Sequence, residues 1–344
     1  MKTEKLAAIA RTTLLAALLA LGGAAQAQDK PVELKMSHWV PPTHPTHKTA
    51  LAWAQSVEKA SGGTIKVAVF PAQQLGKAFD HYDMATKGIA DFAFVNVGYQ
   101  AGRHVVASMI QLPFMVANAD GGSRAFDEWY RGHAERDMPG VKMCMAFVHD
   151  PGTLHSRTRI SSPDQLKGMK IRPAQSGVAE WMRALGATNV TVSAPEAREA
   201  LERGVADALT FPWESVYLFG LDKVTRFHID AKMYVTGFAW LMNPAKYAAM
   251  SPAQKKVIDD HCNGEWAQRN GREWGEVEAG GRAKTLSNST HTVVQLSPAE
   301  LDAWRKSAAP VVGAWSDEAK KAGHDPQALI DEFQRVLTKH GARL

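Results

Sequence analysis

The chain has 344 residues, with 40 Lys or Arg, 35 Asp or Glu, two Cys and a formal net charge of +5. Charged residues make up 22% and apolar residues 45%. This composition is ordinary for a soluble protein and excludes a disordered tail, a collagen-like repeat and a disulfide-stapled miniprotein. The length suits two domains, each large enough to bury a core.

The first 27 residues have the layout of a secretory signal peptide. A short basic segment (1–11) precedes an apolar run (12–21), and Ala25-Gln26-Ala27 fits the small-residue cleavage pattern. The apolar run is too short to span a bilayer as a helix, which takes about 20 residues. We therefore expect a periplasmic protein whose leader is removed after Ala27.

Removal of this leader also lowers the net charge of the chain. The leader carries a net charge of +2, so the mature chain carries +3. The mature chain has no long Lys/Arg block and no interleaving of aromatic and basic residues. Nucleic acid is therefore not an expected partner.

Strands and helices are predicted to alternate along most of the chain. Strands are predicted over 32–36, 64–70, 91–97, 141–148, 168–172 and 206–211. Helices are predicted over 51–60, 79–87, 163–166, 176–185 and 193–203. This alternation indicates an α/β fold with largely parallel sheets. A long helical stretch follows from Ser251 toward Leu286, with doubtful continuity at its glycines, and another helix begins at Ser297.

The two cysteines leave an alternative open. Export to an oxidising compartment permits a disulfide between Cys144 and Cys262. Cys144 lies in an apolar run, however, and a buried free thiol is the interpretation that we favour from the sequence.

No common enzyme signature is present. The sequence lacks a G-x-S-x-G turn, a P-loop, a G-x-G-x-x-G loop, an H-E-x-x-H helix and a C-x-x-C pair. His38, His44 and His47 lie close together, which is one way to build a metal site. The prolines between them favour an extended loop without helical spacing. Solvated loop histidines, or one of them in contact with a ligand, are the interpretation that we prefer, and we expect no metal and no cofactor.

Arg172 is the strongest candidate for binding. It ends a predicted strand just before Pro173, and ligands of α/β sheets bind beyond the carboxyl ends of strands. An arginine there offers a fixed fork of donors that matches a carboxylate. A surface arginine in a structural salt bridge is the alternative.

Aromatic residues follow other strand ends. Trp39 comes after the first predicted strand, and Phe211 and Trp213 come at the end of the strand 206–211. Trp240 lies in the apolar segment 238–241. Together these residues indicate a pocket with aromatic walls and one cationic anchor, although each of them also suits an ordinary core.

The chain resembles a known family at these residues and along most of its length. The motifs that carry the resemblance are FPAQQLG at 70–76, GIADF at 88–92, LPF at 112–114, DQLKGMKIR at 164–172, LGA at 185–187 and EAREALERGVAD at 196–207. Their order and spacing are similar to those of the solute-binding proteins of tripartite ATP-independent periplasmic (TRAP) transporters, of the dicarboxylate-binding-subunit type.

The resemblance implies a two-lobed α/β clamshell braced by a long helix across both lobes. We expect lobe I over 28–152 plus about 239–280, and lobe II over 153–238 plus about 281–344. It also implies a monomer without catalytic activity, which captures a small organic acid and delivers it to the membrane subunits of a TRAP permease. The arginine of the family's K-x-R motif clamps the ligand carboxylate, and here that position is Arg172.

Departures from the family pattern bear on the ligand. Phe211 stands where the family often has a ligand-contacting Asn, and Asn96 stands where sialic-acid-binding members have Glu. His155 lies where such members place a second arginine. A second buried carboxylate without a partner would cost several kcal/mol. We therefore expect a monocarboxylate with an apolar or aromatic body.

The predicted site combines these residues. Arg172 takes the carboxylate, Asn96 and His155 hydrogen-bond any hydroxyl or keto group, and the aromatic body packs against Trp39, Phe211, Trp213 and Trp240. One rival is a C4-dicarboxylate ligand, with Arg103 or Lys77 as the second anchor. Others are a periplasmic hydrolase or isomerase using His155, and a binding protein that serves a sensor kinase.

Overall fold

Two β-sheets organise the protein in a computed structural model, which describes residues 29–344. The predicted signal peptide lies outside the described residues. The first sheet has the order β2-β1-β3-β10-β4. Its strands are β1 (Val32–Ser37), β2 (Ile65–Phe70), β3 (Phe92–Asn96), β4 (Lys142–Val148) and β10 (Gly237–Met242). The second has the order β11-β9-β5-β8-β6-β7. Its strands are β5 (Thr153–Ser156), β6 (Lys170–Arg172), β7 (Thr188–Asn189), β8 (Ala208–Phe211), β9 (Phe227–Ile229) and β11 (Thr292–Val294).

Both sheets are mixed, and the expectation of largely parallel sheets holds for every strand in them except β5 and β10. β10 runs antiparallel to β3 and β4, and β5 runs antiparallel to β8 and β9. β5 follows directly on a change of sheet from β4, and β10 on a change from β9, whereas the third change leads from β10 through the helix α11 into β11. A strand that enters from the other sheet needs no helical crossover, so nothing forces it to run parallel to its new neighbours. The remaining pairs are parallel.

Helices cover both sheets, and several begin at a side-chain cap. The α-helices are α2 (Pro45–Ala60), α3 (His81–Thr86), α4 (Ala119–Tyr130), α5 (Ala134–Asp137), α6 (Ser176–Ala184), α7 (Ala197–Glu202), α8 (Trp213–Leu218), α9 (Pro244–Ala248), α10 (Pro252–His261), α11 (Gly264–Ser287), α12 (Pro298–Ser307), α13 (Ala309–Lys321) and α14 (Pro326–Lys339). The 3-10 turns are η1 (Ala78–Asp80), η2 (Val97–Tyr99), η3 (Ala107–Gln111), η4 (Pro163–Leu166), η5 (Ala194–Glu196) and η6 (Leu221–Lys223). Capping boxes at Ser251 and Ser297 start α10 and α12.

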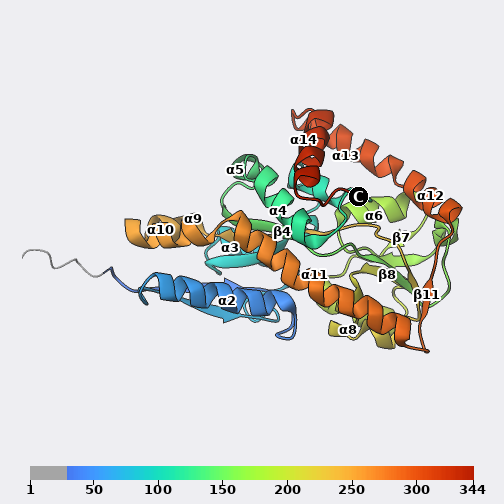
Figure 1. Ribbon diagram of the computed structural model, residues 1–344, viewed down its shortest axis with the longest axis horizontal. Coiled ribbons are helices and arrows are strands. Elements are labelled where there is room, and N and C mark those ends of the chain that lie inside the picture. Colours follow the sequence, from blue (N-terminus) through green and yellow to red (C-terminus); the bar gives the residue numbers. More distant parts are fainter. Residues whose placement is uncertain (1–28) are drawn as a thin grey trace, which may run out of the picture.

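The long helix α11 connects the two sheets. It packs against α4 beside the first sheet and against α8 beside the second, and Figure 1 shows it as the orange helix that runs obliquely along the molecule. The expected stretch breaks at Cys262 and Asn263, between α10 and α11, and not at its glycines. Gly271 and Gly281 let the helices approach, because a Cβ would overlap the Ser123 side chain at the first position and the Glu214 backbone at the second.

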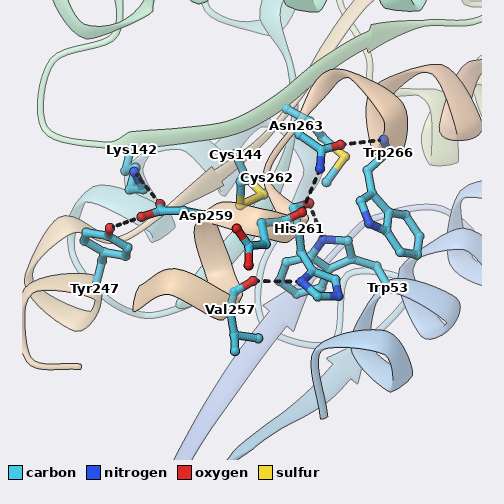
Figure 2. Close-up of a disulfide and its surroundings, with 12 residues drawn as sticks. Trp53, Lys142, Cys144, Tyr247, Val257, Asp259, His261, Cys262, Asn263 and Trp266 are labelled. Atoms are coloured by element: carbon cyan, nitrogen blue, oxygen red, sulfur yellow. Dashed lines mark hydrogen bonds and ion pairs between the residues drawn. A yellow bond between two sulfur atoms is a disulfide. The ribbon is translucent and has the colours of Figure 1, made fainter. Parts of the chain in front are cut away.

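A disulfide joins Cys144 and Cys262, so the expectation of a free buried thiol was wrong. The two residues are 118 positions apart in sequence, and their Cα atoms lie 4.3 Å apart. The bond ties β4 to the junction between α10 and α11, beside the buried Trp53, whose Nε1–H donates to the carbonyl of His261 (Figure 2). The pairing fixes the start of the long helix to the first sheet.

The final helices wrap back over the molecule, in red in Figure 1. α13 packs against α6, which flanks the second sheet, and α14 packs against α4, which flanks the first. The expected boundaries of the two lobes stay a prediction. Among residues 29–344, no helix combines the length and the apolarity that crossing a membrane requires.

Candidate functional site

A cavity lies where segments that follow strands of both sheets meet. Trp39 and Asn96 contribute to its wall from the first sheet, and Arg172 and Phe211 from the second. These four belong to the seven side chains predicted for the site. The cavity therefore lies at the meeting of the two sheets, where α11 also contributes Trp274.

Arg172 is a buried cation without an acidic partner. Its residue is 1% exposed, and no ion pair joins it to an Asp or Glu of the described chain. Nε–H donates to the carbonyl of Val192 at 3.1 Å, Nη1 to the carbonyl of Thr210 at 3.5 Å and Nη2 to Tyr99 Oη at 3.2 Å. A guanidinium has five N–H donors, so two remain for a further acceptor. The ordinary way to stabilise such a charge is an anion.

The Tyr99 hydroxyl lies beside this cation and has one unused hydrogen-bond donor. Its hydroxyl oxygen accepts from Arg172 Nη2 and, at 2.9 Å, from the Ala194 backbone N–H. Both lone pairs are therefore used, and the O–H has no acceptor within residues 29–344. Tyr99 lines the cavity, so its O–H and the free N–H groups of Arg172 can serve the same anionic ligand.

Asn96 braces the loops around the cavity. Its Oδ1 accepts from the Gly98 N–H at 2.9 Å, which starts the turn that carries Tyr99. Its Nδ2 donates to the carbonyl of Ala174 at 3.3 Å, in the segment that follows Arg172. Asn96 therefore links the two sheets at the cavity, in addition to lining it.

A closed series of aromatic contacts surrounds the cavity, and we call these seven residues the aromatic belt. Neighbouring ring centroids lie 4.6–6.3 Å apart. In order, the belt consists of Tyr99, Trp39, Phe238, Trp274, His44, Phe219 and Phe211. Arg172 closes it, because its guanidinium carbon lies 5.3 Å from the Phe211 ring centroid and its Nη2 bonds Tyr99. Such a wall suits a flat apolar body.

Three predicted site residues do not line this cavity. Trp240 packs into the first sheet, with its ring centroid 5.3 Å from that of Phe94. The Trp213 ring lies 5.5 Å from that of His155, behind Phe211. His155 itself is fully buried and has partners for both ring nitrogens. A strand places alternate side chains on opposite faces, so a position near a strand end does not by itself aim a side chain at the ligand.

The partners of His155 form a chain of three neutral histidines. His155 Nε2–H donates to the carbonyl of Phe211 at 2.9 Å, and His155 Nδ1 therefore accepts from His228 Nδ1–H at 2.7 Å. His228 Nε2 then accepts from His291 Nδ1–H at 2.8 Å. Burial lowers the pKa of His155 to about 4, and burial with the neighbouring histidines lowers the pKa of His228 to about 2. This chain holds the backbone of Phe211, a belt residue.

The histidines of the first loop are buried, so the expectation of solvated side chains was wrong for two of them. His38 and His44 are 0% and 1% exposed, and His38 Nε2 lies 2.8 Å from His47 Nδ1. Within the described chain, no three or more His, Cys, Asp or Glu side chains are placed to hold a metal ion. His44 alone of the three lines the cavity, and it caps α2 by accepting from the Thr46 N–H.

Glu278 lies behind the belt and joins α11 to α8. Its carboxyl accepts from Trp274 Nε1–H at 2.7 Å, from Ser215 Oγ–H at 2.6 Å and from the N–H groups of Glu214 and Ser215. Burial raises the pKa of Glu278 to about 7, although these hydrogen bonds oppose the rise. Ser215 and Trp274 line the cavity, so this carboxyl couples the long helix to the cavity wall.

Several lining residues were missed by the sequence reasoning. Phe238 and Trp240 lie on the same face of β10, and the sequence alone favoured the tryptophan. Phe238 pairs with Asn96 at the cavity end of β3, whereas Trp240 pairs with Phe94, two residues further into the sheet. Tyr99 follows the predicted strand 91–97 by two residues, the same kind of signal that selected Trp39. Trp274 lies in the middle of a long helix, and no local signal distinguishes it from a core residue.

Comparison with known families gives one match that spans most of the chain. Residues 36–318 match the family described as bacterial extracellular solute-binding protein, family 7. Solved structures are similar over the same extent. A TRAP solute-binding protein from Rhodoferax ferrireducens, in complex with copurified benzoate, is 30% identical with a TM-score of 0.85, covering 90% of this chain and 98% of that one.

Two further structures carry related ligands. A TRAP solute-binding protein from a marine metagenome, specific for aromatic acids and in complex with 3-hydroxybenzoate, is 31% identical with a TM-score of 0.84. One from Bordetella bronchiseptica, with bound (R)- and (S)-mandelate, is 28% identical with a TM-score of 0.84. In both comparisons 90% of this chain and 99% of the other chain are covered.

Proposed function

Because this chain belongs to family 7 of the bacterial extracellular solute-binding proteins and is a TRAP transporter component, we propose that its ligand is an aromatic monocarboxylate. Proteins of this family are periplasmic transport proteins, not enzymes, and they work with membrane permease subunits. We propose that this chain binds as a monomer, after removal of its leader near Ala27, and delivers its ligand to such a permease.

The observation that carries this proposal is the buried Arg172 without an acidic partner. Its two unused N–H donors match the two oxygens of one carboxylate, and the Tyr99 O–H supplies another donor beside them. A ligand carboxylate would neutralise the charge and satisfy these donors together. The seven rings of the belt would pack against the rest of the ligand.

A dicarboxylate fits this cavity less well. Arg172 is the one Lys or Arg among the described residues that line it. Burial holds the pKa of His44 well below 6.5 and lowers that of His149 to about 4, so neither imidazole supplies a second positive charge. Arg103, the second anchor considered from the sequence, pairs with Asp83 at 3.0 Å on the surface. A second carboxylate would therefore be buried without a counter-charge.

Ligand capture is explained by the contribution of both sheets to the wall of the cavity. Arg172 and Phe211 come from the second sheet, and Trp39 and Phe238 from the first. A ligand that contacts all four stabilises the closed arrangement over an open one, because only the closed arrangement makes both sets of contacts. The helix α11, which packs against both sides, would bend or pivot as the lobes open.

A titration of the exported protein with benzoate, 3-hydroxybenzoate, mandelate and succinate tests this proposal. We expect saturable binding of the aromatic acids by calorimetry, and about 2.7 kcal/mol of stabilisation at 100 times Kd. We expect no comparable effect of succinate. Tighter binding of succinate than of every aromatic acid would contradict the proposal.

A further inference from the structure

His44 belongs to the aromatic belt and is separated from Arg172 by Phe211 and Phe219 along the shorter series of contacts. From Arg172 one path runs through Tyr99, Trp39, Phe238 and Trp274, and the other through Phe211 and Phe219. Both paths end at His44, whose ring centroid lies 4.6 Å from that of Trp274 and 6.2 Å from that of Phe219. The cavity wall therefore carries a cation and, separated from it by other belt residues, an imidazole.

The proton of this imidazole has a defined position. His44 Nδ1 accepts from the Thr46 N–H at 3.2 Å, in the N-cap of α2. Burial, with His38 and His149 nearby, holds the pKa of His44 well below 6.5, so the ring is neutral. A neutral imidazole whose Nδ1 accepts must carry its hydrogen on Nε2. That Nε2–H has no acceptor in the part of the chain that the structure describes, and the residue is 1% exposed.

His44 lines the cavity, so an acceptor on a ligand can take up this donor, which the described chain leaves without a partner. We propose that His44 recognises a polar substituent on the ligand, remote from its carboxylate, by donating a hydrogen bond from Nε2. The preferred ligands are then aromatic monocarboxylates whose ring carries an oxygen acceptor, such as a phenolic hydroxyl. This inference rests on the proposed function, because Arg172 must hold the carboxylate for the ring to extend toward His44.

The other histidine on the cavity wall does not compete for this role. His149 Nδ1–H donates to the carbonyl of Asp150 at 2.5 Å, and Nε2 accepts from the Thr236 N–H at 3.2 Å. Both of its ring nitrogens are therefore used within the chain. Trp39 Nε1–H is also buried without an acceptor. Its ring contacts Tyr99, which bonds Arg172, so in the order of contacts Trp39 lies closer to the carboxylate-binding group than His44 does.

The test compares ligands as well as variants. Kd is measured by calorimetry for benzoate, 3-hydroxybenzoate and 4-hydroxybenzoate, with the wild-type protein and with His44→Phe. The readout is the ratio of the Kd of benzoate to that of the tighter hydroxybenzoate, because this ratio cancels effects that act on both ligands. We expect a ratio of about ten in the wild type and about one in His44→Phe.

Two further variants separate the donor from the fold. His44→Ser retains an oxygen that can cap α2 but is too short to reach the position of Nε2, so a ratio near one in this variant as well shows that the lost donor, not the lost cap, is responsible. His47→Phe makes the same change one helical turn later, outside the cavity lining, and should keep the wild-type ratio.

The outcomes distinguish this inference from the proposed function. Failure of the wild type to bind benzoate or either hydroxybenzoate contradicts the proposed function itself. Binding of benzoate with no preference for a hydroxybenzoate overturns the His44 inference alone. Persistence of the preference in both His44 variants overturns it too, because another group would then be the donor.

Discussion

Arg172 and His155 lie on opposite sides of β8, and both pair with Leu209 in the register of the second sheet. Both are buried polar side chains at strand positions that the sequence selected for ligand binding. The histidine has partners within the chain for both ring nitrogens, whereas the arginine keeps two donors without acceptors and has no counter-ion. This difference supports the proposal that Arg172 binds a ligand, whereas His155 holds the fold.

Substitution of Arg172 should give the largest change in binding. In Arg172→Met we expect the affinity for benzoate to fall by at least about 100-fold, since two charge-assisted hydrogen bonds are lost. We expect the Tm of the ligand-free protein to change by less than about 5 °C, because the lost hydrogen bonds are offset by removal of an unpaired buried charge. Calorimetry and thermal unfolding measure the two quantities.

Arg103→Met is the matched control for this variant. Arg103 is exposed and pairs with Asp83 outside the cavity lining, so this change should keep the benzoate affinity. An equal loss of affinity in the two variants would show that Arg172 has no special role.

His155 should show the opposite pattern. In His155→Leu the His228 Nδ1–H and the Phe211 carbonyl lose their partners, and we expect the free energy of unfolding to fall by about 2–3 kcal/mol. Urea unfolding measures this loss. Adding His228→Leu removes one of the unsatisfied groups and should recover part of it. A loss of benzoate affinity as large as that in Arg172→Met, in protein shown to be folded, would place His155 in the binding site after all.

The pH dependence of stability distinguishes two kinds of buried, hydrogen-bonded group, the histidines His155 and His228 and the carboxyl of Glu278. His155 and His228 have ordinary pKa values near 6.5 when unfolded and about 4 and 2 when folded, so acidification below pH 6.5 removes stability, because only the unfolded chain gains protons. Glu278 acts in the opposite direction. Its pKa is about 7 when folded and 4.5 when unfolded, so between these values the folded state holds the extra proton and acidification adds stability.

Glu278→Gln isolates this smaller effect. The variant lacks the stability that protonation of Glu278 adds on acidification. As the pH falls from 7 to 4.5, its free energy of unfolding should therefore fall more steeply than that of the wild type, by about 1 kcal/mol per pH unit. Urea unfolding at four or five pH values measures both slopes. Identical slopes would mean that the carboxyl of Glu278 titrates normally in the folded protein.

Local sequence was sufficient to predict most of the helices and strands. Alternating apolar residues predicted β1 and β2, an apolar run predicted β4, and serine-proline caps predicted the starts of α10 and α12. The same reasoning placed Arg172 at a strand end, where Pro173 stops the strand, and the motif that contains it indicated the family. These features depend on residues that are neighbours in the chain, so the sequence contains the necessary information.

Only the tertiary structure decided which side chains share the cavity. The disulfide between Cys144 and Cys262 joins positions 118 residues apart, and the antiparallel course of β5 and β10 follows from the chain changing sheets. The directions of His155 and Phe238 depend on strand register, since a shift of one residue turns a side chain to the other face. The presence of His44 on the same cavity wall as Arg172 depends on how both sheets and α11 close the aromatic belt, which no local pattern contains.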